Sequence, residues 1–234
     1  WLGGGDHMWV VYNVVTDNLV DGISVQLRES RHNMIYGNLV SGNGRTGLLL
    51  SGREYQEWDP LDSVSYGLAN SSHSVVQRNL FGDNAEGDIF LSATRGIVLA
   101  SNCGADDGDP DVVVGPETHD LIELGACELQ PDNRLPQVVL LDAGTQVGTP
   151  AQFSASQSWD PDEQELSFYW LAEPFATSFH GGELPVPNLT GVGGGEAFAL
   201  FWAPGVYSLA VTVLDGVGAA MATAQVYVAP AGDE

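Results

Sequence analysis

The chain has 234 residues, enough for a sizeable core, and carries a formal net charge of −24 at pH 7 from 31 acidic and 7 basic residues. All the basic residues are arginine, and this excess of negative charge argues against nucleic acid as a partner, because phosphate backbones are bound by positive surfaces. No apolar run reaches the roughly 20 residues that a membrane-spanning helix needs.

The first half of the chain repeats a short pattern: two apolar residues, two variable residues and an asparagine. The copies end at Asn18, Asn38, Asn79 and Asn102, and a turn and a second apolar strand follow the copies. A unit this short cannot bury an apolar face alone, so neighbouring units must stack. Because asparagine tolerates left-handed backbone and its amide both donates and accepts, we predict that these four residues form a hydrogen-bonded ladder.

These copies resemble the repeats of right-handed parallel β-helix proteins, the fold of pectate lyases, alginate epimerases, phage tailspikes and many bacterial surface proteins. The resemblance covers residues 1–128 and specifies the fold better than the activity. The chain opens without Met, in Trp1-Leu2-Gly3-Gly4-Gly5, with a repeat already under way. We therefore interpret it as a piece of something longer.

The interval between Asn38 and Asn79 is about one coil too long, so an inserted loop is expected at residues 51–72. This loop combines aromatic rings with charged groups, a composition that suits sugars, since apolar sugar faces stack on rings and hydroxyls bond to charged groups. The alternative is that its rings only fasten the loop to the surface. The predicted carbohydrate-binding residues are Arg53, Tyr55, Trp58, Asp59 and Tyr66.

The chain has two cysteines, Cys103 and Cys127, near the end of the repeat region. A disulfide between them is expected in an oxidising compartment, and two unpaired thiols are the alternative. The disulfide favours an extracellular or cell-surface location. The acidic, lysine-free composition fits a solvated extracellular face, a salt-rich setting, cation binding or simply solubility.

Three aspartates between the cysteines, Asp107, Asp109 and Asp111, alternate as at the start of an EF-hand calcium loop. The match ends there, because Val112 and Thr118 stand where that loop needs glycine and glutamate. A Ca²⁺ site of another geometry therefore competes with a simple solvated acidic turn.

Residues 129–136 are polar and contain two prolines, which indicates a linker. Over residues 137–230, short alternating strands separated by turns predict an antiparallel β-sandwich. The strings FSASQSWDPDEQELSFYW (153–170) and APGVYSLAVTVLDGVG (203–218) resemble the PKD-type immunoglobulin-like domain. That resemblance implies a spacer or a module that contacts polysaccharide.

Sandwiches related to this family hold Ca²⁺ near domain junctions through carboxylates, so the resemblance points to Asp160, Asp162 and Asp215 as ligands. Hard cations take oxygen ligands that turns can bring together. The alternative is that Asp160 and Asp215 cap their own turns through backbone N–H groups. Calcium is the one cofactor that the sequence suggests.

These features favour a secreted or cell-surface structural and binding protein that contacts polysaccharide, surface glycan or neighbouring subunits. A polysaccharide lyase, epimerase or hydrolase is an alternative, but no catalytic residue is assigned because the candidate Arg and Asp side chains are scattered over turns. A filament subunit is another alternative. It would self-associate through the open β-helix end at residues 1–13 by strand addition.

Overall fold

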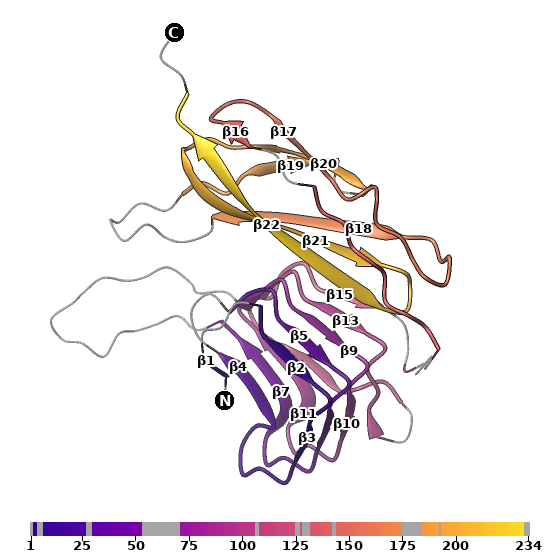
Figure 1. Cartoon of the computed structure of the whole chain (residues 1–234). Helices are drawn as coiled ribbons and strands as arrows, with labels where there is room; N and C mark the ends of the chain where they lie inside the picture. The colour runs from indigo at the N-terminus through magenta and orange to yellow at the C-terminus, as the bar shows by residue number, and fades with distance from the viewer. Residues whose placement is uncertain are drawn as a thin grey trace, which may run out of the picture. The chain divides into compact units, whose positions relative to one another are not determined.

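The computed structural model describes residues 2–3, 7–26, 30–52, 71–105, 108–124, 127, 132–141, 144–174, 184–191 and 193–231. The chain divides into two compact units, Trp1–Pro131 and Asp132–Glu234, which Figure 1 colours from indigo to yellow. The boundary falls inside the segment predicted as a linker. Among the described residues, no helix is long and apolar enough to cross a membrane.

The first unit is built from short strands paired in parallel, and each turn of the chain adds a strand to the long sheets. One five-stranded sheet contains β1 (Leu2–Gly3), β4 (Ile23–Gln26), β7 (Thr46–Ser51), β11 (Gly87–Ser92) and β14 (Val112–Val114). A second contains β2 (Trp9–Val11), β5 (Met34–Tyr36), β9 (Val75–Gln77), β13 (Val98–Ala100) and β15 (Ile122–Leu124). Two smaller sheets contain β3 (Val14–Thr16), β6 (Leu39–Ser41) and β10 (Leu80–Gly82), and β8 (Ser71–Ser72) and β12 (Thr94–Arg95).

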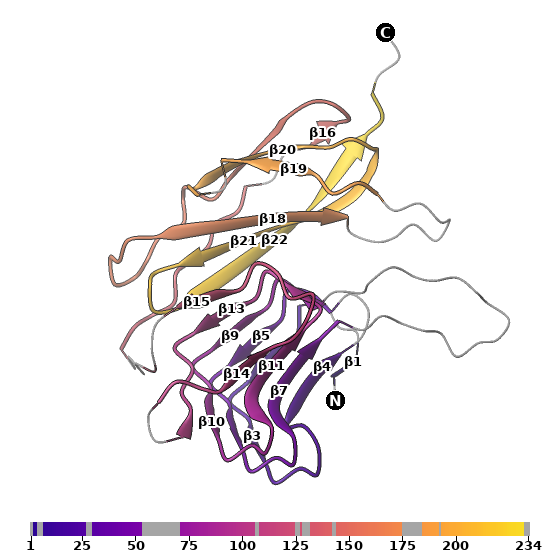
Figure 2. The ribbon, with the colours of Figure 1, turned by 180° about the vertical axis from the view of Figure 1, so that it is seen from behind.

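The core of the first unit lies between these sheets, as the stacked coils in Figure 2 show. Side chains from successive coils meet in register, since Ile35 of β5 pairs with Val76 of β9 and both are fully buried. The buried cluster consists of Ile23, Val25, Ile35, Val40, Leu48, Leu50, Val76, Phe81, Ile89, Leu91, Ile97 and Leu99.

The chain turns between sheets at corners where a left-handed residue precedes an asparagine. One column of corners has Tyr12, Gly37, Arg78 and Ser101 at positive φ, each directly before an asparagine. The asparagine side chain points inward, where its amide bonds to the next coil. The side chains that line this column are Asn13, Asn38, Asn79 and Asn102.

The predicted asparagine ladder is wrong at its first member. Asn18 donates from its backbone N–H and its amide to Asn43 Oδ1, at 3.2 and 2.9 Å, and so belongs to a second column that continues to Asn84. Asn13 takes the place beside Asn38. The repeated pattern occurs at two different corners of a coil, because strand β3 pairs with β6. The pattern alone therefore does not tell which column an asparagine joins.

The second unit contains two sheets. One has the order β16 (Thr145–Gln146), β22 (Ala219–Ala229), β21 (Gly205–Leu214) and β18 (Ser167–Pro174), and the other β17 (Ala151–Ser154), β20 (Glu196–Leu200) and β19 (Asn188–Thr190). Both sheets contribute to one core, which includes Phe153, Trp170, Phe201 and Tyr207. The Trp170 indole donates to the carbonyl of Gly194 at 2.9 Å, which satisfies its polar atom inside that core.

The fold class predicted from the sequence, a right-handed parallel β-helix followed by an antiparallel immunoglobulin-like sandwich, is corrected by these pairings. The described strands of the first unit form four separate parallel sheets, and the second unit is mixed, because β16 pairs with β22 in parallel. An asparagine after a tight corner meets a local backbone requirement and does not by itself specify a named fold. The fold of this chain is therefore defined by its sheets and their strand order.

Candidate functional site

The carbohydrate-binding residues predicted from the sequence lie outside the described residues. These are Arg53, Tyr55, Trp58, Asp59 and Tyr66, and the predicted calcium ligand Asp107 lies outside them as well. The predicted site in the inserted loop therefore stays a prediction.

An aromatic and arginine cluster occupies the outer surface of the first unit, on three successive coils. The rings of Tyr12 and Tyr36 meet edge to face, with centroids 5.3 Å apart and an interplanar angle of 86°. Arg78 donates from Nη1 to the Tyr36 hydroxyl at 3.2 Å, and its guanidinium carbon lies 6.0 Å from the Tyr36 ring centroid. We call Tyr12, Tyr36, Arg78 and the neighbouring Trp9 the tyrosine–arginine face.

Register and corner geometry place these side chains together. Tyr12 and Arg78 are left-handed corner residues, and Gly37 is the corner residue of the coil between them. A Cβ atom on Gly37 would lie 2.8 Å from Cε1 of Tyr12, so a larger residue there would displace the ring from its present position. Because β2, β5 and β9 pair in parallel, the residues at this corner line up along the stack.

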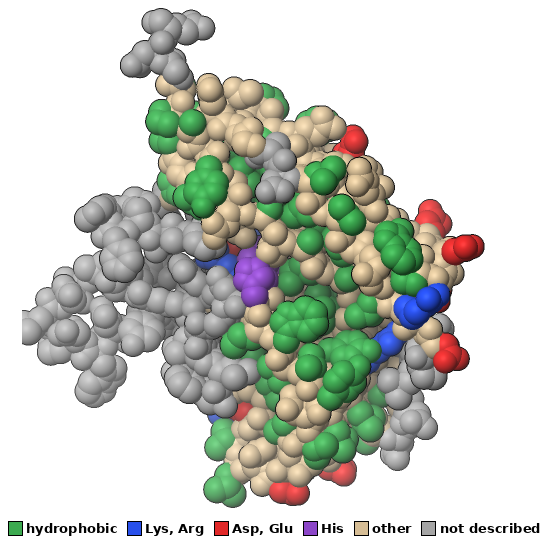
Figure 3. Space-filling view, in the orientation of Figure 1, with side chains coloured by type: hydrophobic (Ala, Val, Ile, Leu, Met, Phe, Trp, Pro, Cys, Tyr) green, Lys and Arg blue, Asp and Glu red, His purple; other side chains and the backbone are tan. Residues whose placement is uncertain are grey.

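Two members of the tyrosine–arginine face are open to solvent, while Tyr36 and Arg78 are half-buried. Trp9 and Tyr12 are each 73% exposed, although they are large apolar side chains. Figure 3 shows hydrophobic side chains gathered on this side of the first unit, with acidic side chains mostly at its margins. The hydrogen bond to Tyr36 raises the pKa of Tyr12 above its ordinary value near 10, so the Tyr12 hydroxyl stays protonated at physiological pH.

This arrangement supplies what a saccharide needs from a protein surface. Exposed rings stack on apolar sugar faces, tyrosine hydroxyls both donate and accept, and the guanidinium offers planar donors. The sequence interpretation missed this face because its residues are 24 and 42 positions apart, from Tyr12 to Tyr36 and from Tyr36 to Arg78. A usable signal was the position directly before the asparagine, where Tyr12 and Arg78 both stand.

Cys103 and Cys127 form a disulfide, with their Cα atoms 4.6 Å apart. Of the aspartates predicted as calcium ligands in this segment, Asp109 accepts a hydrogen bond from the Cys127 backbone N–H at 3.0 Å. The backbone N–H of Asp111 donates to Asp88 Oδ2 at 3.1 Å. Asp109 therefore helps to close the disulfide segment, and the Asp111 backbone joins its strand to the preceding coil.

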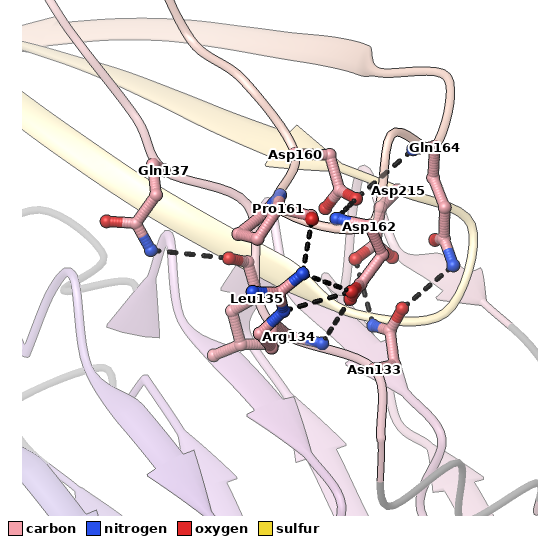
Figure 4. A network of polar contacts seen from close by, with 9 residues as sticks. All are labelled: Asn133, Arg134, Leu135, Gln137, Asp160, Pro161, Asp162, Gln164 and Asp215. Carbon is pink, nitrogen blue, oxygen red and sulfur yellow. Dashed lines mark hydrogen bonds and ion pairs between the residues drawn. The ribbon is translucent and has the colours of Figure 1, made fainter.

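The aspartates predicted as ligands in the second unit belong to a polar network that Figure 4 draws. Asp160 Oδ1 accepts the backbone N–H groups of Asp162 and Gln164, at 2.7 and 3.1 Å. Asp215 Oδ1 accepts the N–H groups of Val217 and Gly218, at 2.8 and 2.5 Å. Both aspartates therefore cap their own turns.

The third aspartate is paired with an arginine. Arg134 donates to Asp162 from its backbone N–H at 2.7 Å, from Nε at 2.9 Å and from Nη2 at 2.8 Å, and Nη2 also reaches the Pro161 carbonyl. These hydrogen bonds lower the pKa of the Asp162 carboxyl. We call this pair, together with Asn133 and Asp215, the polar clasp, since the Asn133 amide donates to Asp215 Oδ2 at 3.0 Å.

The polar clasp does not fit a calcium site formed by Asp160, Asp162 and Asp215. Asp162 already faces a guanidinium, and Asp215 accepts from two backbone N–H groups and an amide. Among the described residues, no group of three or more His, Cys, Asp or Glu side chains is placed to hold a metal ion. Asp160 Oδ2 is a buried acceptor without a hydrogen bond, so it is the one carboxylate oxygen here that a cation could take without breaking a bond.

Three histidines stack at another corner of the first unit. Their spacing in the sequence is not that of metal ligands. His32 and His73 lie parallel with centroids 5.3 Å apart, and His7 lies 4.8 Å from His32. Burial lowers the pKa of His32 to about 2 and that of His73 to about 3. Both imidazoles are therefore neutral at physiological pH and serve as packed rings.

Comparison with known proteins gives little further assignment. No family model and no curated protein matches this chain. Among solved structures, the chain is similar to a nucleoside hydrolase-related hypothetical protein from Saccharophagus degradans that is associated with carbohydrate metabolism, with a TM-score of 0.34 and 19% identity. The match covers 45% of this chain and 28% of that chain, so the chain spans less than a third of that protein.

The two family resemblances named from the sequence, to parallel β-helix repeat proteins and to PKD-type immunoglobulin-like domains, are corrected by this outcome. No family model matches the chain, so neither resemblance is supported by one. The strings from the second unit include turn residues, such as Asp160 and Asp215, whose hydrogen bonds serve the backbone locally.

Proposed function

We propose that this protein is a secreted or cell-surface scaffold that contacts polysaccharide through the tyrosine–arginine face. The observation that carries the proposal is the ordered contact of the exposed Tyr12 with the half-buried Tyr36 and, through Tyr36, with the half-buried Arg78. Exposed aromatic rings cost solvation free energy unless a ligand or partner covers them. Holding them in fixed geometry also lowers the ordering cost when a ligand binds.

The disulfide between Cys103 and Cys127 supports the extracellular part of the proposal, because disulfides persist in oxidising compartments. The net charge of −24 keeps such a surface protein soluble. No catalytic residue is proposed.

A glycan array followed by calorimetric titration of the full chain tests the function. Replacing the exposed ring in Tyr12→Ala, or the cation in Arg78→Gln, is expected to weaken binding of the selected glycan by about tenfold. Tyr227→Ala, which removes a tyrosine that is 65% exposed on β22 of the second unit, is the matched control and should bind like the wild type. Absence of glycan binding over the whole array would overturn the proposal.

A second candidate function is self-association through the exposed apolar surface at β3 and the turn after it. Two apolar side chains there are exposed, Val14 at 71% and Leu19 at 95%. Sedimentation of the full chain and of the Leu19→Asp variant distinguishes self-association from glycan binding. Self-association predicts that the full chain forms oligomers and that the variant is monomeric.

A further inference from the structure

The second column of asparagines contains the one place in the sequence where asparagine is directly followed by glycine, Asn43 and Gly44. Asn43 lies between Asn18 and Asn84 in this column and is 1% exposed. Its Oδ1 accepts the backbone N–H and the amide of Asn18, at 3.2 and 2.9 Å. Its own amide donates to Asn84 Oδ1 at 2.8 Å. The column therefore holds the Asn43 side chain from both sides.

Packing against the preceding coil favours glycine after Asn43. A Cβ atom on Gly44 would lie 2.4 Å from the Leu19 carbonyl oxygen and 2.9 Å from the Leu19 carbonyl carbon, and both are backbone atoms. The Gly44 N–H also donates to the Asn18 carbonyl at 2.8 Å. The column uses the asparagine and the close approach uses the glycine, so the architecture itself places the two residues next to each other.

An asparagine before a glycine is chemically labile, because glycine has no side chain to shield its backbone nitrogen. After losing its proton, the Gly44 nitrogen attacks Cγ of Asn43, ammonia leaves, and a cyclic imide closes. Water then opens either carbonyl group of the imide, which gives aspartate or isoaspartate. The net reaction converts an amide and water into an acid and ammonia, and it needs no oxidant or cofactor.

Both reacting groups are held apart from this chemistry in the folded chain. The Gly44 N–H is bonded to Asn18, and the Asn43 amide is bonded to Asn84. The imide can close only when the Gly44 nitrogen leaves its acceptor and the Asn43 side chain leaves the column. Asn18 is the exposed end of the column, so opening of the coil around it releases both groups. Local opening of this kind costs less free energy than complete unfolding.

The product of the reaction does not fit the column. A carboxylate in place of the Asn43 amide still accepts from Asn18, but it has no hydrogen to donate to Asn84 Oδ1. Two acceptors would then oppose each other, and a charge would be buried without a partner. Isoaspartate would also lengthen the backbone by one carbon atom and displace the corner. The column would therefore not re-form after the reaction.

We propose that Asn43 and Gly44 form a spontaneous deamidation site, which the asparagine column keeps unreactive and which converts irreversibly when the coil around Asn18 opens. The column then protects the chain chemically as well as stabilising the stack. This inference does not depend on glycan binding, since none of its residues belongs to the tyrosine–arginine face.

The test compares the rate of conversion at Asn43 in the full chain in mildly alkaline buffer, folded and unfolded in urea. Peptide mass spectrometry and labelling by an isoaspartyl methyltransferase measure it. Unfolding is expected to raise the rate by about a hundredfold. Asn18→Ala, which removes one hydrogen bond to Asn43 Oδ1, should raise the folded rate about fivefold. Asn188→Ala, at an exposed asparagine of β19, is the matched control and should leave the rate unchanged.

A urea series below the unfolding transition gives a second measurement on the wild-type chain. The rate at Asn43 is expected to rise before the chain unfolds, while Asn84, which precedes Ala85, stays intact. Equal rates in the folded and unfolded chain would refute the protection, and no conversion in urea would refute the reactivity. A rate that rises only at complete unfolding, or one that Asn18→Ala leaves unchanged, would refute gating by the coil around Asn18.

Discussion

At the scale of single residues, the buried asparagines carry an unusual share of the polar contacts. Asn79 is fully buried, and its amide donates to the carbonyl of Ile35 at 2.9 Å and to Asn102 Oδ1 at 2.9 Å. Its Oδ1 accepts both the backbone N–H and the amide of Asn38. One side chain therefore satisfies polar groups on the coils on both sides of it.

We predict that Asn79→Ala lowers the free energy of unfolding by about 3 kcal/mol, because it leaves buried donors and acceptors on two coils without partners. Asn13→Ala, at the exposed end of the same column, should cost less than about 1 kcal/mol. Urea denaturation of the full chain compares the two. Equal losses would contradict the idea that burial makes the column important for stability.

At the scale of elements, the stacked histidines make the first unit sensitive to acid. His32 and His73 titrate at about 2 and about 3 in the folded chain, because burial disfavours their charged forms, whereas an unfolded histidine titrates near 6.5. Below pH 6.5 the unfolded chain thus binds more protons than the folded one. Stability contributed by the neutral rings is complete above pH 6.5 and is lost as the pH falls towards 3.

We predict that, as the pH falls from about 6 to about 4, each of these histidines lowers the free energy of unfolding by about 1.4 kcal/mol for every pH unit. The double variant His32→Asn/His73→Asn should flatten this slope, even if it is less stable at pH 7. Denaturation at several pH values measures it, with the exposed His119→Asn as the control. An unchanged slope in the double variant would exclude the stack as the cause.

In the polar clasp, Arg134 supplies the positive charge that balances the Asp162 carboxylate. The Arg134 guanidinium faces Asp162 where a cation was predicted from the sequence. We predict that the melting temperature of the wild-type chain is the same with excess Ca²⁺ and with a chelator. Arg134→Ala, which frees the Asp162 carboxylate, should be stabilised by Ca²⁺, with Arg45→Ala as an exposed control. A wild-type melting temperature that falls in chelator would contradict this account.

The sequence predicted parts of these elements and missed others for physical reasons. An asparagine after each corner was predictable, because the left-handed backbone at the corner and the inward amide depend only on the residues of that turn. The column to which Asn18 belongs was not, because pairing between coils sets the register. The contact of Tyr36 with Arg78 also depends on that register and on the room left by Gly37.

At the scale of the whole molecule, the chain joins two units that each expose aromatic side chains. The first carries the tyrosine–arginine face, and the second carries Phe198 and Trp202. Such rigid β units position rings without loops having to order on binding, which lowers the entropic cost of contacting a polymer. The proposed contact with polysaccharide uses the ordered rings of the first unit.

Hydroxyl-radical footprinting of the full chain, with and without the polysaccharide selected on the array, tests this claim most directly. Oxidation of Trp9, Tyr12 and Tyr36 is predicted to fall when the polysaccharide is bound, while Tyr227 stays as reactive as in the free chain. Unchanged oxidation of Tyr12 and Tyr36 in the presence of bound polysaccharide would contradict the proposed contact surface.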